Sequence, residues 1–259
     1  MTKKEIYRKR GIEYKDGKIY HSEFGFIPEL LVNGNSKIGK GVYHFSTLPT
    51  NQIFHVVING KSYDIKGTCP CNCVGCYATK GNYNYTSVKT SLAIKTWLIR
   101  NDLQFVKNAL IAQIEADKIE YTRLHASGDF DSMEYVNMIK EVVTTCKACT
   151  FWTYTKNADA ENAFDGIENI NIVKSVIKGK GFNFGHCEYI LAMYEYLKAQ
   201  GKTVYICRCG IDKNQHCTNC KGCSKNEHVL FIEHSTEYKA ENDPLFETLK
   251  TVIEAQEKF

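Results

Sequence analysis

The sequence has few prolines and no long apolar run, and both absences limit its architecture. Four prolines in 259 residues leave no proline-rich linker. No apolar segment approaches the roughly 18 residues that a membrane-spanning helix needs. The charged N-terminus lacks the apolar stretch of a secretory signal. We therefore expect a globular cytoplasmic protein with no membrane partner.

The sequence also has little excess of positive over negative charge. Lysine and arginine total 33 against 29 acidic residues, a formal charge of +4. Residues 1–18 account for that excess, so the rest of the chain lacks the broad basic field that holds a long duplex. Nucleic acid is thus a weakly supported partner, and we interpret the basic N-terminal arm as a solvated terminus.

Cysteines, by contrast, are abundant. The chain has 12 of them, and a chain of this length can fold around an apolar core without disulfides. In a reducing cytoplasm, clustered thiols indicate metal ligands or catalytic groups.

Short strands alternate with helical segments after residue 69, which predicts parallel strands joined by helical crossovers. We expect an α/β protein with a partial (β/α)6 TIM-like barrel; a flat doubly wound sheet competes with it. Residues 1–66 form an N-terminal arm and β extension, 67–206 the partial barrel, and 207–259 a cysteine-rich region with the last strand and helix. The expected strands are the one just before Cys69 and 121–125, 151–154, 170–176, 203–207 and 229–233; a hairpin is expected at 53–65; the helices are 88–99, 103–116, 131–144, 158–164, 188–199 and 244–257.

The first cysteine segment packs four thiols into residues 69–76. Cys69, Cys73 and Cys76 have the spacing C-x3-C-x2-C, and Cys71 is an additional thiol that competes as a ligand. Thiolates this close in sequence converge only on a loop, as around an iron–sulfur cluster. Zinc is the alternative, although zinc sites usually pair two C-x2-C units separated by a longer stretch.

This spacing, on a loop after a first strand, resembles the radical S-adenosylmethionine enzymes. The resemblance implies that three cysteines bind a [4Fe-4S] cluster and S-adenosylmethionine binds the fourth iron. In that family an electron from the cluster cleaves the cofactor, and the resulting radical abstracts a hydrogen atom from substrate. An aromatic residue usually precedes the last cysteine; here Gly75 does, and Tyr77 follows. We expect Tyr77 to lie beside the cofactor.

A second resemblance covers residues 69 to 223. The runs Thr68-Cys69-Pro70, Cys76-Tyr77-Ala78, residues 123–130 (RLHASGDF) and residues 151–156 (FWTYTK) look like the gene product eighty-eight family. That family comprises small proteins of phages and mobile elements, and its function is poorly defined, so the resemblance implies no reaction.

A second cysteine region spans residues 207–223. Cys217, Cys220 and Cys223 have the spacing C-x2-C-x2-C, and Cys207 at the end of a strand is the favoured fourth ligand, with Cys209 competing. Four thiolates close a second [4Fe-4S] cluster. The layout is similar to the auxiliary clusters of some radical S-adenosylmethionine enzymes. A structural zinc ion remains the alternative at this second site.

The loop Ser127-Gly128-Asp129 follows the expected strand 121–125. In the radical S-adenosylmethionine family a turn here meets the cofactor's amine, which implies binding by Ser127, Gly128 and Asp129. Helix capping explains the same residues. His125 and Asp129 are the candidate catalytic residues, with His125 as the candidate for proton handling. The alternative for His125 is a core histidine with no catalytic role. Ser175, near the end of the expected strand 170–176, is placed to contact a ribose hydroxyl.

These features favour an iron–sulfur enzyme of the radical S-adenosylmethionine type with an unknown substrate. It would need an electron donor such as a ferredoxin or flavodoxin. A non-catalytic or electron-transfer iron–sulfur protein and a zinc-stapled nucleic-acid-binding module are the two alternatives.

Overall fold

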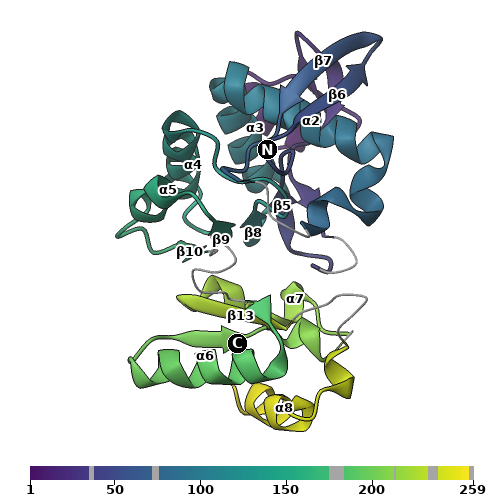
Figure 1. Cartoon of the computed structure of the whole chain (residues 1–259). Coiled ribbons are helices and arrows are strands. Elements are labelled where there is room, and N and C mark those ends of the chain that lie inside the picture. The colour runs from purple at the N-terminus through teal and green to yellow at the C-terminus, as the bar shows by residue number, and fades with distance from the viewer. Residues whose placement is uncertain (35–37, 72–75, 175–183, 213, 233–238, 257–259) are drawn as a thin grey trace.

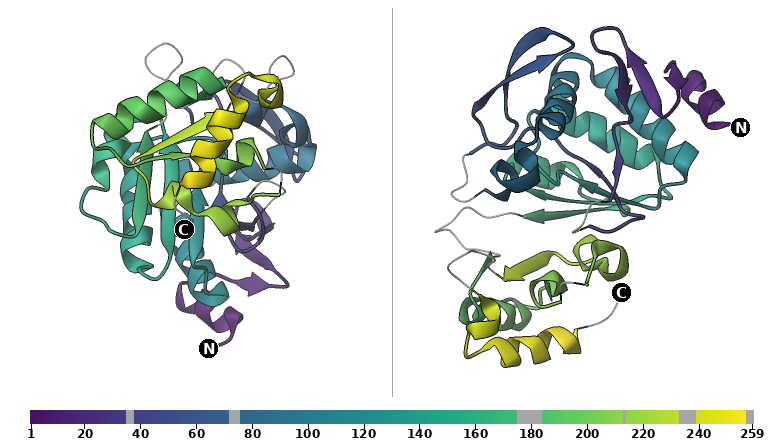
Figure 2. Two further views of the ribbon diagram at one scale, coloured as in Figure 1. Left: turned by 90° about the horizontal axis from the view of Figure 1, so that it is seen from below. Right: turned by 90° about the vertical axis from the view of Figure 1, so that its right-hand side faces the viewer.

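The computed structural model describes residues 1–34, 38–71, 76–174, 184–212, 214–232 and 239–256. Its central layer is a mostly parallel sheet, which lies between a helical layer and a smaller C-terminal layer (Figures 1 and 2). No helix in the described ranges is long and apolar enough to cross a membrane.

The main sheet has the strand order β10-β9-β8-β5-β4. Neighbours among the first four strands are parallel, and the short edge strand β4 is antiparallel to β5. The strands are β4 (Val32–Asn33), β5 (Tyr43–Phe45), β8 (Tyr121–Leu124), β9 (Thr150–Thr155) and β10 (Ile170–Lys174).

Helices pack on one face of this sheet and form the larger core with it. Phe45, Leu124 and Phe151 point into that core from three neighbouring strands. The helices of the layer are α2 (Thr86–Asn101), α3 (Leu103–Asp117), α4 (Met133–Thr145) and α5 (Ala158–Ala163). Each lies within a few residues of the segment that apolar periodicity predicted.

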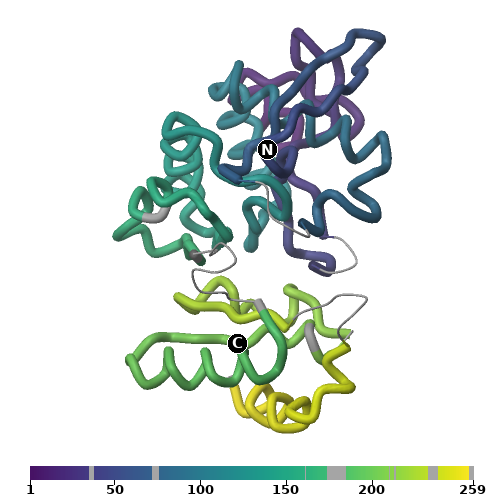
Figure 3. The backbone as a smooth tube through the Cα atoms, in the orientation of Figure 1, coloured from purple at the N-terminus to yellow at the C-terminus, as the bar shows by residue number. Residues whose placement is uncertain are grey.

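The C-terminal layer has its own three-stranded parallel sheet, ordered β11-β13-β12, and its own core. The green and yellow part of the tube in Figure 3 traces this layer. Residue 207, where we placed a boundary, lies inside it. Its elements are β11 (Phe184–Gly185), α6 (Cys187–Ala199), β12 (Val204–Ile206), β13 (His228–Ile232) and α8 (Phe246–Ala255).

The basic N-terminal arm is folded, which corrects our expectation of a solvated terminus. Helix α1 (Lys3–Lys9) has a capping box, and Tyr7 on it is fully buried. The Lys3 ammonium pairs with Glu29 at 2.9 Å and with Asp117 at 2.7 Å. A small antiparallel sheet follows, made of β1 (Tyr14–Lys15), β2 (Lys18–His21) and β3 (Gly25–Pro28).

The strand before Cys69 does not join the main sheet, contrary to our expectation. The predicted hairpin is present as β6 (Ile53–Ile58) and β7 (Lys61–Lys66), and β7 pairs only with β6 among the described strands. The place beside β8 belongs to β5. The described parallel strands thus fall into two sheets, and the partial barrel stays a prediction.

Two helices start two residues later than predicted. Helix α4 is capped by Ser132, whose hydroxyl accepts from Tyr135 N, whereas Asp131 pairs with Arg100. Helix α8 begins at Phe246, because the Asp243 carboxylate accepts from Leu245 N in a turn ahead of the helix.

Candidate metal centres

The first cysteine segment begins at the carboxyl edge of the main sheet. Cys69 N donates to Thr50 O at 2.9 Å, just beyond the end of β5. The Thr68 hydroxyl lies 2.8 Å from the Thr47 hydroxyl and accepts from Asp129 N at 2.9 Å. The segment therefore starts between the ends of β5 and β8, the edge at which ligands bind in parallel α/β sheets.

The other end of the segment returns to the same edge. Tyr77 opens the short helix η1 (Tyr77–Thr79), and its hydroxyl donates to the Ala126 carbonyl. Tyr83, in η2 (Gly81–Asn84), donates to the same oxygen at 3.3 Å. Cys69, Cys71 and Cys76 are each partly exposed, and Cys73 lies outside the described residues.

The Ser-Gly-Asp loop closes tightly onto the end of β5. Ser127 Oγ donates to Thr47 O at 2.8 Å, and Thr47 N donates back to Ser127 O at 3.1 Å. Gly128 has a φ of +80°, and a Cβ there would lie 1.9 Å from Thr47 Oγ1 and 2.6 Å from Thr68 Oγ1. Only glycine fits this crossing of the first cysteine segment and the β8 loop.

Asp129 holds this loop to the end of β9. Its buried carboxylate accepts from Phe130 N at 2.8 Å, Thr155 Oγ1 at 2.6 Å and Lys156 N at 2.8 Å. Burial raises the pKa of this carboxyl, although the three hydrogen bonds act in the opposite direction. These contacts give Asp129 a structural role in the loop; contact with a cofactor amine stays a prediction.

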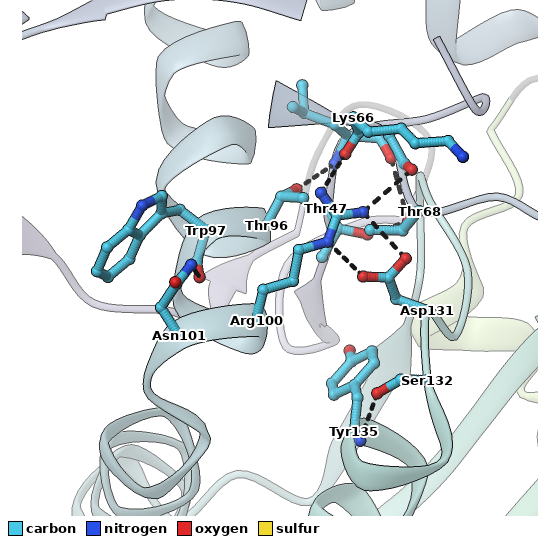
Figure 4. Close-up of polar contacts among 12 residues, drawn as sticks. Thr47, Lys66, Thr68, Thr96, Trp97, Arg100, Asn101, Asp131, Ser132 and Tyr135 are labelled. Atoms are coloured by element: carbon cyan, nitrogen blue, oxygen red, sulfur yellow. Dashed lines mark hydrogen bonds and ion pairs between the residues drawn. The ribbon is translucent and has the colours of Figure 1, made fainter. Parts of the chain in front are cut away.

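Arg100 on α2 anchors the residues that lead into the first cysteine segment (Figure 4). Its guanidinium donates to the carbonyls of Lys66 at 2.6 Å and Gly67 at 3.2 Å. It also binds both carboxylate oxygens of Asp131, at 2.5 and 3.0 Å. One side chain thus fixes the approach to Cys69 against the start of α4.

His125 points into the helical core rather than toward the cysteines. Its Nδ1 lies 3.2 Å from Thr153 Oγ1, and its Nε2 lies 2.9 Å from the Tyr135 hydroxyl. Its pKa is lowered to about 3, mainly by burial and to a smaller extent by repulsion from the Arg123 charge. This geometry is that of a neutral core histidine, the alternative stated above, and a role in proton handling stays a prediction.

The depressed pKa of His125 predicts loss of stability in mild acid. An unfolded histidine titrates near 6.5, so the unfolded chain binds the extra proton between pH 6.5 and about 3. The contribution of His125 is complete above pH 6.5 and is lost as the pH falls. We expect the free energy of unfolding to drop by about 2 kcal/mol between pH 6.5 and 5 on this account.

Urea unfolding at several pH values measures this drop. His125→Asn, which tolerates the residue's positive φ of 56°, should flatten the pH dependence. His55→Asn, at an exposed position, is the control and should leave the dependence unchanged. Equal slopes for the wild type and His125→Asn would contradict the assignment.

The second cysteine region packs on the opposite face of the main sheet. Asn171 of β10 donates to the carbonyls of Cys223 at 2.7 Å and Asn226 at 2.8 Å. Thr218, in α7 (Cys217–Cys220), donates through its hydroxyl to Lys40 O at 2.6 Å. The short helices η3 (Arg208–Gly210) and η4 (Gly222–Ser224) flank α7.

The thiols of this region gather in one apolar cluster with sheet residues. Cys207, Cys220 and Cys223 are buried beside Trp152 and Val173. Cys209 and Cys217 are partly buried against the same cluster, and Cys220 Sγ lies 2.9 Å from the Tyr205 hydroxyl. All four predicted ligands and the competing Cys209 are therefore brought together. As the side chains are placed, no three metal-ligating groups among the described residues stand at metal-binding separation.

Arg123 lies between the two cysteine regions. Its guanidinium is over the Tyr154 ring, 5.2 Å from the centroid. Burial alone would lower the pKa of this guanidinium. Its surroundings raise the pKa overall, through Tyr77, Tyr154, Cys217 and Cys223. The sequence motif contained Arg123, but we gave it no role, because only the strand register shows which face it occupies.

The remaining candidates fall elsewhere. Cys146 and Cys149, a third C-x2-C pair, are buried in the helical core, and the Cys149 thiol lies 3.3 Å from Thr122 Oγ1. Cys187 is fully buried at the start of α6. Ser175 lies outside the described residues.

Fold and site together define an α/β protein with two cysteine-rich segments at the sheet that β5, β8, β9 and β10 form. A family model described as Gene product 88 matches residues 29–181. This match covers more than half of the chain, and the protein belongs to the Gene product 88 family. It contains the first cysteine segment but not residues 207–223. No curated protein and no solved structure matches the chain.

Proposed function

We propose that this protein is an iron–sulfur enzyme of the radical S-adenosylmethionine type with two cysteine-bound centres. The observation that carries the proposal is the meeting of both cysteine regions at Ala126. The Ala126 carbonyl accepts from Tyr77 and Tyr83, which follow the first segment. The buried Ala126 side chain packs in the cluster that holds Cys207, Cys220 and Cys223.

In this proposal Cys69, Cys73 and Cys76 hold the first cluster, and one of its irons stays open to S-adenosylmethionine. Thiolates are the ligands that iron–sulfur clusters take. The bound cluster and cofactor supply the one-electron chemistry, while the chain orients the substrate. Cys207, Cys217, Cys220 and Cys223 hold the second cluster, with Cys209 and Cys71 as competing ligands.

The residues around the first segment supply a rigid frame. Gly128 permits close approach of the β8 loop to Thr47 and Thr68. Asp129 ties that loop to β9, and Arg100 fixes the residues before Cys69. The exposed Tyr77 side chain lies directly after Cys76. A frame of this kind fixes both ends of the segment, at Cys69 and Cys76, and an open cluster site requires such support.

Iron and acid-labile sulfide in anaerobically purified full-length protein test the proposal. We expect about eight of each per chain, as two four-iron clusters require. The double variant Cys69→Ser/Cys76→Ser should retain about half. Cys146→Ser, which changes a buried thiol in the helical core, is the matched control and should keep the full amount. Stoichiometric zinc without sulfide would overturn the proposal and favour the zinc-stapled alternative.

A further inference from the structure

Two strands of the main sheet present buried N–H donors toward the second cysteine region. Arg123 and Trp152 are register partners on the parallel strands β8 and β9, so their side chains share one face of the sheet. Arg123 Nε and Trp152 Nε1 are both buried and have no hydrogen-bond partner within the described part of the chain. Buried donors left in this state cost about 1–3 kcal/mol each.

The surroundings of these donors indicate what they bind. Trp152 is 1% exposed and packs with Cys207, Cys220 and Cys223. A diffusing substrate has no access to such an indole, so the acceptor is a resident group. The buried cysteines around Trp152 suit a thiolate-bound metal centre. The sulfur atoms of such a centre are anionic and accept N–H hydrogen bonds.

We infer that Arg123 and Trp152 donate hydrogen bonds to the sulfur atoms of the iron–sulfur cluster held by the second cysteine region. The inference rests on the proposed function. Donors to cluster sulfur stabilise the more negative, reduced state, so they raise its reduction potential. These two residues position the cluster and tune its reduction potential without ligating it. Because both lie on strands of the main sheet, that potential depends on how the cluster is placed against the sheet.

Potentiometric titration of the second cluster tests this inference. The full chain carries Cys69→Ser/Cys76→Ser, so that one cluster titrates. Trp152→Phe, which keeps the ring and removes the N–H donor, should retain iron and sulfide. At the midpoint potential of the parent, its ratio of reduced to oxidised cluster should fall about tenfold, which corresponds to about 59 mV for one electron.

Two further variants complete the design. Arg123→Lys keeps the charge and removes Nε, and it should shift the potential in the same direction. Trp97→Phe changes the only other tryptophan, on α2 in the helical layer, and should leave the potential unchanged. Retained iron with an unchanged potential in Trp152→Phe and Arg123→Lys would overturn this inference alone. Absence of iron and sulfide from the parent would overturn the proposed function as well.

Discussion

Replacing Gly128 by alanine should destabilise the protein by about 3 kcal/mol or more and remove iron from the first centre. A positive φ costs a residue with a side chain about 1–2 kcal/mol. The new Cβ would also lie 1.9 Å from Thr47 Oγ1, and overpacking of this kind adds about 1–3 kcal/mol. Relief of the clash requires the β8 loop to move away from Thr68 and hence from Cys69.

Gly60→Ala is the matched control for this prediction. Gly60 has the same φ of +80°, in the turn between β6 and β7, but a Cβ there meets nothing within 4 Å. Urea unfolding should give it a cost of about 1 kcal/mol, with the iron content of the wild type. The difference between the two variants isolates the clash, and equal costs would show that the loop does not need this close approach.

Removing the second centre should detach the cysteine-rich region from the sheet. The double variant Cys220→Ser/Cys223→Ser loses two buried thiols of the proposed second centre. We expect about half of the iron to disappear. Metal binding and local folding are coupled at such sites, so residues 207–223 should become sensitive to limited proteolysis.

Cys149→Ser is the control, because Cys149 is also buried but lies in the helical core. It should keep the metal content and the protease resistance of the wild type. If the double variant retained all of its iron and resisted protease like the control, the second cysteine region would not hold a centre.

Local patterns predicted the helices well and the strand pairing poorly. The apolar periodicity places α3 within one residue of its observed bounds, because this signal is local. The three-residue strand β5 left no such signal, and it joins the sheet only through its pairing with β8. Alternation in the segment before Cys69 predicted the β6–β7 hairpin correctly, but it could not show that β7 stays outside the main sheet.

The candidate site shows the same division. The cysteine spacings located both thiol groups. The first segment follows a strand, as predicted, but that strand is outside the main sheet, and the segment starts beside the end of β5 instead. The roles of single side chains depend on register and loop closure, which no local pattern contains. The structure turns His125 into the helical core, whereas its neighbour Arg123 faces the cysteines. The two unpartnered donors became recognisable only once that face was known.

The most direct test of the central claim, an open iron at the first centre, uses the Cys220→Ser/Cys223→Ser chain. Its electron paramagnetic resonance spectrum is recorded after anaerobic reduction, with and without S-adenosylmethionine. We predict a reduced-cluster signal that changes when S-adenosylmethionine is added, together with formation of 5'-deoxyadenosine. A cluster signal that stays the same, with no 5'-deoxyadenosine formed, would contradict the account and favour an electron-transfer protein whose first cluster is closed by a fourth ligand.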